Sequence, residues 1–182
     1  MRITRLRITL AVSFAAAAVA IPLTVISLAS AGDDRSLTAV AASATARFHD
    51  LDKAKAAGWN VLVTDVNNLT CIDNQPVGGM GVHYANASIL FDAELDPTQP
   101  EALVYAPNAD GQIKLAALEY IVFAQAWTDA GNTQPPTLFG QPFFYTAEPN
   151  RYGLHPFWAL HAWIWEPNPA GLLQPWNPRV HC

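Results

Sequence analysis

The sequence predicts an α+β fold in which one N-terminal helix packs on a curved antiparallel sheet of about five or six strands. Residues 36–57 form the one stretch in which apolar side chains recur steadily at three- and four-residue steps, as on one face of a helix. The later segments alternate over short runs that Pro, Gly and Asn interrupt, which is typical of strands joined by turns. One segment with the helical spacing of apolar residues, followed by several with the alternation of strands, therefore predicts the α+β class.

The chain begins with the features of a secretory leader. Three arginines within residues 1–7 precede a nearly uninterrupted apolar run over residues 8–28, and Ala-Ser-Ala at 29–31 resembles a signal-peptidase site. These features predict that residues 1–31 are a signal peptide and that the protein is secreted or extracytoplasmic. The run is also long enough to span a bilayer, so an uncleaved membrane anchor is the alternative. Residues 32–182 are expected to form a single α+β domain.

The predicted mature chain is acidic. Removing the three leader arginines from the 10 Lys+Arg leaves 7 against 15 Asp+Glu, a net charge of −8 with neutral His. An acidic chain without a basic run argues against nucleic acid as a partner. Contact with a membrane is expected only if the leader is uncleaved, which leaves a small-molecule ligand as the expected partner.

The two cysteines, Cys71 and Cys182, are expected to form a single disulfide, because exported proteins fold in oxidising compartments. That bond would tie the last residue of the chain to an early loop. Two unpaired thiols are the alternative.

The elements follow in order along the chain. The helix over 36–57 is expected to begin at Ser36 as its N-cap and to end at Gly58, which suits the left-handed position after a helix. Residues 127–152, rich in Pro, Gly and polar side chains, are expected to form a long ordered loop that could act as a lid. Strands are expected over 61–66, 80–86, 101–106, 112–124 and 158–165, with 101–124 forming a hairpin.

Glu119 is an acid in the middle of an otherwise apolar strand face. Strict alternation places it with Ile113, Leu115, Ala117 and Ile121. A lone buried carboxylate is costly, so buried acids are paired, hydrogen-bonded or bound to metal. Glu119 therefore needs a partner.

Two histidines are the candidate partners. His83 shares its strand face with Gly81 and Ala85, whose small size leaves space over the imidazole. By alternation, His161 shares its face with Trp163 and Trp165, which could line a pocket.

His83, Glu119 and His161 can converge if their strands are neighbours in one sheet. Two imidazoles and a carboxylate suit a divalent transition metal such as Zn, Fe(II), Mn or Cu. A metal-free site with Glu119 as general base is also consistent with these residues. The alternative is a structural network in which Glu119 accepts hydrogen bonds from the histidines, since no local spacing motif links the three.

Several short segments together resemble a group of uncharacterised secreted bacterial proteins. They are Gly-Met-Gly-Val-His-Tyr at 79–84, His-Ala-Trp-Ile-Trp at 161–165, Asn-Pro-x-Gly at 168–171 and Trp-Asn-Pro at 176–178 before Cys182. The resemblance covers most of the mature chain. It implies export and a single domain, and it carries over no activity and no catalytic residue.

The sequence thus predicts a secreted protein that binds a small ligand or a metal. Its pocket would be lined by His83, Glu119, His161, Trp163 and Trp165. One alternative is a metal-dependent enzyme that uses His83, Glu119 and His161. The other is a structural or cell-envelope interaction protein.

Overall fold

The computed structural model describes residues 29–108 and 110–182. The leader predicted over 1–31 lies almost wholly outside these residues. Within the described ranges, no helix is both long and apolar enough to cross a membrane.

The helical elements are α1 (Ala29–Thr45), the 3-10 helix η1 (Ala46–His49), α2 (Leu51–Ala56) and α3 (Ala124–Asp129). The strands are β1 (Trp59–Leu62), β2 (Cys71–Asn74), β3 (Gly78–Asn86), β4 (Ala102–Pro107), β5 (Ile113–Phe123), β6 (Thr137–Leu138), β7 (Gln141–Pro142), β8 (Phe144–Thr146) and β9 (Phe157–Ala162).

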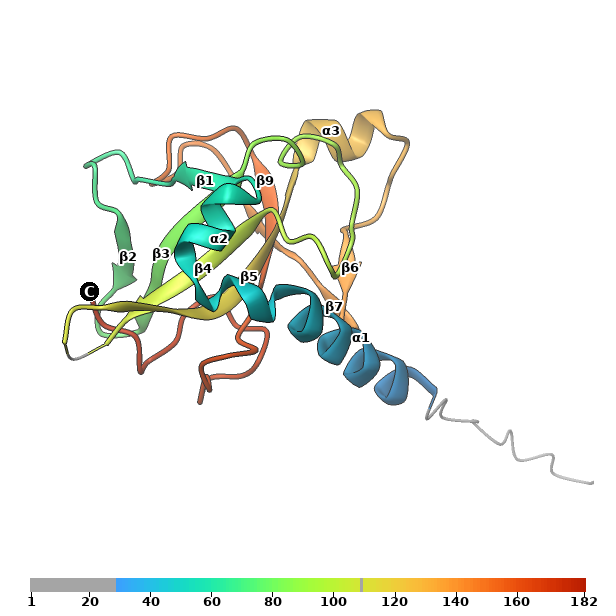
Figure 1. Ribbon diagram of the computed structural model, residues 1–182. Coiled ribbons are helices and arrows are strands. Elements are labelled where there is room, and N and C mark those ends of the chain that lie inside the picture. The colour runs from blue at the N-terminus through green and yellow to red at the C-terminus, as the bar shows by residue number, and fades with distance from the viewer. Residues whose placement is uncertain (1–28, 109) are drawn as a thin grey trace, which may run out of the picture.

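One antiparallel sheet of seven strands organises the described residues, which confirms the predicted α+β class. Its order is β1-β3-β4-β5-β9-β8, and β2 pairs with β3 beside β1. The predicted hairpin is present as β4 and β5. The short strands β2 and β8 were not expected, because runs of three or four residues carry too little alternation to be recognised. In Figure 1, α2 lies across one face of the sheet and α1 passes beside β7.

The helix predicted over 36–57 is not continuous. Residues 29–35 are already helical, so Ser36 is not its N-cap, and the helix breaks after η1. At the break, Asp50 has extended backbone angles and its carboxylate accepts from the backbone N–H groups of Asp52 and Lys53, so it caps α2 as a new helix. The apolar spacing continues across this break, which is why periodicity alone did not reveal it. The helix ends as predicted, with Gly58 at φ +110°.

The main core lies between the helices and one face of the sheet. Phe48 is almost fully buried there, and its ring lies 4.7 Å from that of Trp59. Tyr105, from the centre of the sheet, donates its hydroxyl to the Phe48 carbonyl at 2.7 Å. This bond satisfies a carbonyl that the broken helix would otherwise leave unpaired.

We expect Tyr105→Phe to lower the free energy of unfolding by roughly 1–2 kcal/mol, because it leaves that buried carbonyl without a donor. Chemical denaturation monitored by circular dichroism measures the loss. Tyr145→Phe is the matched control, since Tyr145 is 52% exposed. Equal stability of the two variants would contradict the assigned role of the hydroxyl.

A bulge in the central hairpin corrects the predicted alternation of β5. Val104 pairs with Ala117 but Tyr105 pairs with Leu115, so Ala116 is an extra residue. Leu115 was expected on the face of Glu119, yet it packs in the helix-side core. Beyond the bulge the expected alternation holds, and Glu119 lies on the face away from the helices.

The predicted disulfide is confirmed, with the Cys71 and Cys182 sulfurs 2.06 Å apart. Such a bond is typical of oxidising, extracytoplasmic compartments. It ties the end of the C-terminal tail to β2, and earlier in the tail Asn177 exchanges two backbone hydrogen bonds with Gly79 of β3 at 3.1 and 2.9 Å. A Cβ atom on Gly79 would lie 2.7 Å from the Val180 carbonyl oxygen, so the tail can approach this closely only at a glycine.

Candidate functional site

Three side chains meet on the sheet face opposite the helices. His83 Nε2 lies 3.4 Å from Glu119 Oε2 and 3.3 Å from His161 Nε2. His161 Nδ1 lies 3.7 Å from Glu119 Oε1. One ligand atom from each residue can be chosen so that all three atoms lie within 4.8 Å of one another. The predicted convergence of these residues is therefore confirmed.

Strand register explains how residues far apart in sequence meet. Glu119 on β5 is directly opposite His161 on β9. His83 comes from β3, on the far side of β4, where Ala102 is the residue opposite Glu119. The order β3-β4-β5-β9 separates the histidine backbones by three strand spacings, which is about 14 Å. The two imidazoles nevertheless approach each other to 3.3 Å between their Nε2 atoms, so both side chains reach across the strands between them.

Burial sets the protonation of this group. His83 is 4% exposed, Glu119 8% and His161 1%. Burial raises the pKa of Glu119 to about 8 and lowers the pKa of His83 to about 4. Burial, reinforced by the neighbouring His83 ring, lowers the pKa of His161 well below its ordinary value. Although His83 and Glu119 are within ion-pair distance, desolvation outweighs their attraction and favours the neutral form of each group.

The hydrogen bonding of the group is incomplete. Its three contacts span 3.3–3.7 Å, whereas good N–H···O bonds measure about 2.7–3.2 Å. His83 Nδ1 is buried and makes no well-formed hydrogen bond, although the backbone of Gly81 lies close enough to the ring to favour the protonated imidazole. A polar network that existed only for structure would be expected to satisfy these atoms.

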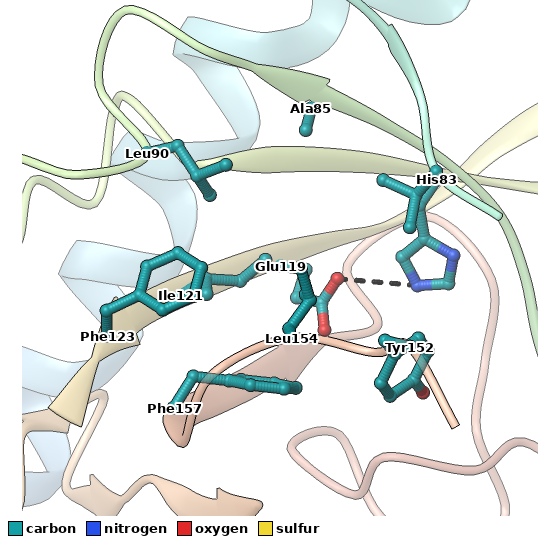
Figure 2. A pocket seen from close by; sticks show the side chains of 10 residues that line it. His83, Ala85, Leu90, Glu119, Ile121, Phe123, Tyr152, Leu154 and Phe157 are labelled. Atoms are coloured by element: carbon teal, nitrogen blue, oxygen red, sulfur yellow. Dashed lines mark ion pairs between the residues drawn. The ribbon is translucent and has the colours of Figure 1, made fainter. Parts of the chain in front are cut away.

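A pocket opens beside His83 and Glu119, and we call it the apolar pocket. Its cavity volume is about 60 Å³. Apart from His83, Glu119 and the hydroxyl of Tyr152, its wall consists of aliphatic and aromatic groups, of which Ala85 is the smallest. In Figure 2, Leu154 and Phe157 lie on the same side of the pocket as the Glu119 carboxylate, and Ala85 and Leu90 lie on the other. The remaining apolar lining residues are Val63, Ile121 and Phe123.

A second pocket, with a cavity volume of about 370 Å³, reaches Glu119 and His161. It is more polar, since Thr146, Asn150 and Arg151 contribute to its wall. Glu119, Tyr152 and Phe157 line both pockets. The His/Glu/His group therefore borders two cavities of different character.

Tyr152 was not among the residues predicted to line the site. Its neighbour Arg151 donates to the Asp73 carbonyl at 2.7 Å and pairs with the Asp65 carboxylate at 3.1 Å, which anchors this part of the predicted loop. The Tyr152 hydroxyl lies 3.3 Å from the sulfur of Met80. Phe157 could have been found from the sequence, because it has the same parity as His161 on β9.

The two tryptophans that were predicted to line the pocket lie in different parts of the structure. The Trp163 ring stacks on His161 at 5.9 Å between centroids, but it is buried in a second core cluster and lines neither pocket. Trp165 instead packs against His49 at 4.6 Å and joins the helix-side core. Alternation fails because β9 ends at Ala162, where the Ile164 N–H turns back to the Ala162 carbonyl.

The chain matches no protein-family model, no curated protein and no solved structure. The resemblance to secreted bacterial proteins therefore stays a prediction.

Proposed function

We propose that the protein binds a divalent transition metal through His83, Glu119 and His161, and that the ion holds a small ligand. The distances between donor atoms carry this proposal. Atoms bound to a tetrahedral ion at 2.0–2.1 Å lie roughly 3.3–3.4 Å apart. Two of the three donor pairs match this spacing, since the Nε2–Nε2 and Nε2–Oε2 separations are 3.3 and 3.4 Å. All three donor atoms lie within 4.8 Å of one another. Two imidazoles and a carboxylate are donors that Zn²⁺, Fe²⁺ and Cu²⁺ accept.

A structural network is less consistent with the same distances. The contacts from His83 and His161 to the Glu119 carboxylate, at 3.4 and 3.7 Å, are longer than good hydrogen bonds, and an ion would use the same nitrogen and oxygen lone pairs. Three protein ligands would also leave a coordination position for water or a ligand, as in zinc sites that carry out chemistry. The cavity beside the group supports binding over a purely structural role.

The test uses the mature chain, purified without an affinity tag and freed of metal with a chelator. We expect one Zn²⁺ per chain by calorimetric titration. Glu119→Gln, which keeps the shape of the protonated acid, and His161→Ala should each weaken binding by at least about 100-fold, because even outer-shell partners are worth roughly 10–100-fold.

His155→Ala is the matched control, because His155 forms an exposed pair with Glu148 at 2.8 Å that resembles the buried one chemically. This variant should bind Zn²⁺ like the wild type. Undiminished binding by folded Glu119→Gln would remove the basis of the proposal.

A metal-dependent enzyme is the second candidate, favoured by an open coordination position facing a cavity. The ion would act as a Lewis acid on a bound ligand or activate a water molecule. We further propose that the protein acts outside the cytoplasm, after loss of residues 1–31. N-terminal sequencing of the exported protein tests the cleavage, and a start at Gly32 is the expected result.

A further inference from the structure

The net charge of the proposed metal site limits the kinds of ligand that the apolar pocket can bind. Among its lining residues Glu119 is the only Asp, Glu, Lys or Arg. A divalent ion with one carboxylate and two neutral imidazoles carries a net charge of +1. A buried charge without a partner is costly, so the open position favours a ligand atom that brings one negative charge.

Nearby charged residues do not supply that charge. Arg151 is cationic and is already paired with Asp65. Glu101, the other buried acid on this part of the sheet, uses one carboxylate oxygen to accept from the Ile121 N–H at 2.8 Å. It does not line the apolar pocket.

The side chains that line the apolar pocket indicate the chemistry of the part of the ligand that lies away from the ion. Ile121, Phe123 and Phe157 offer no hydrogen-bonding side-chain atoms, and Leu90 and Leu154 lie across the same space (Figure 2). A polar ligand body would lose its hydration here without compensation. A hydrocarbon body would gain about three- to fourfold in affinity for each methylene that it buries.

Building on the proposed metal site, we propose that the apolar pocket binds small monocarboxylates with a hydrocarbon body. The carboxylate occupies the open coordination position on the His83 side of the ion. The hydrocarbon extends toward Leu90 and Phe123. The second pocket, with its polar wall, stays open to water at His161.

Matched probes test this class on Zn²⁺-loaded mature protein. Calorimetry compares hexanoate with acetate, 1-hexanol and hexylamine. Hexanoate should bind at least about tenfold more tightly than acetate, because it adds four methylenes worth about three- to fourfold each when buried. It should also exceed 1-hexanol and hexylamine at least tenfold, because neither brings a negative charge. Equal affinity for hexanoate and acetate, or for hexanoate and hexanol, overturns the inference.

Two variants test whether the carboxylate ligand binds in the apolar pocket. Leu154 is 38% exposed at the pocket, and Leu172 is 45% exposed elsewhere. Leu154→Glu puts a carboxylate near the ligand and should weaken hexanoate at least fivefold, with Zn²⁺ affinity within threefold of the wild type. Leu172→Glu should change neither affinity, and equal hexanoate binding by both variants would count against this pocket.

The zinc titration separates the two proposals. If Zn²⁺ does not bind, the metal site and this ligand class both fail. If Zn²⁺ binds and hexanoate shows no preference, only the ligand class fails.

Discussion

The metal-free protein should lose roughly 2–4 kcal/mol of unfolding free energy between pH 6.5 and pH 8, because two buried carboxyl groups are protonated in the folded state. Burial raises the pKa values of Glu101 and Glu119 to about 8, from an ordinary value of 4.5. The folded chain therefore binds more protons than the unfolded chain between these values. Stability from these groups is present at low pH and is lost as the pH rises toward 8, by up to about 1.4 kcal/mol per unit for each group.

The histidines restrict this fall to a defined window. Burial lowers the pKa of His83 to about 4 and that of His161 well below its ordinary value of 6.5. Below pH 6.5 the unfolded chain therefore takes up protons on these histidines that the folded chain does not. This opposes the effect of the two acids, so stability should be nearly flat between about pH 4.5 and 6.5 and should fall only above that.

Urea denaturation at half-unit pH steps measures the profile. Glu101→Gln keeps an oxygen that can accept from the Ile121 N–H, and it should remove about half of the fall. Glu119→Gln should remove the other half, and saturating Zn²⁺ should act in the same direction, because a bound ion keeps Glu119 ionised. Unchanged stability from pH 6.5 to 8 in the wild type would show that neither acid is protonated when buried.

Removing the disulfide should cost about 2–4 kcal/mol. Cys71 and Cys182 are 111 residues apart, so the bond constrains a long loop of the unfolded chain. Thermal unfolding of the Cys71→Ser/Cys182→Ser double variant, compared with the oxidised wild type, measures this loss.

The same variant should keep its Zn²⁺ affinity within about threefold at temperatures where it remains folded. None of the three proposed ligands lies in the tail, and the Asn177–Gly79 hydrogen bonds hold the tail independently of the sulfurs. A large loss of Zn²⁺ affinity in the folded variant would mean that the tail positions the ligands, as its Pro175 and Trp176 in the second pocket could allow.

Local chemistry determined much of this protein in advance. The period of the apolar residues in 36–57 and the alternation in later segments predicted the α+β class, because both depend only on neighbouring residues. The pairing of Cys71 with Cys182 follows when no other cysteine exists. Glu119 was recognisable as a buried acid because its own strand surrounds it with apolar residues.

Only the tertiary structure decided which residues meet. His83 and His161 are 78 positions apart, and their contact depends on strand order and register, which no local pattern contains. The bulge at Ala116 and the end of β9 at Ala162 moved Leu115 and Trp165 to the helix side, because one extra residue or one bend reverses strand alternation. The position of Tyr152 at the site likewise depends on pairing of its neighbour Arg151 with the distant Asp65. The periodicity of apolar residues thus predicted the fold class and the strand face of most side chains. Only the folded sheet brings the two imidazoles to one carboxylate.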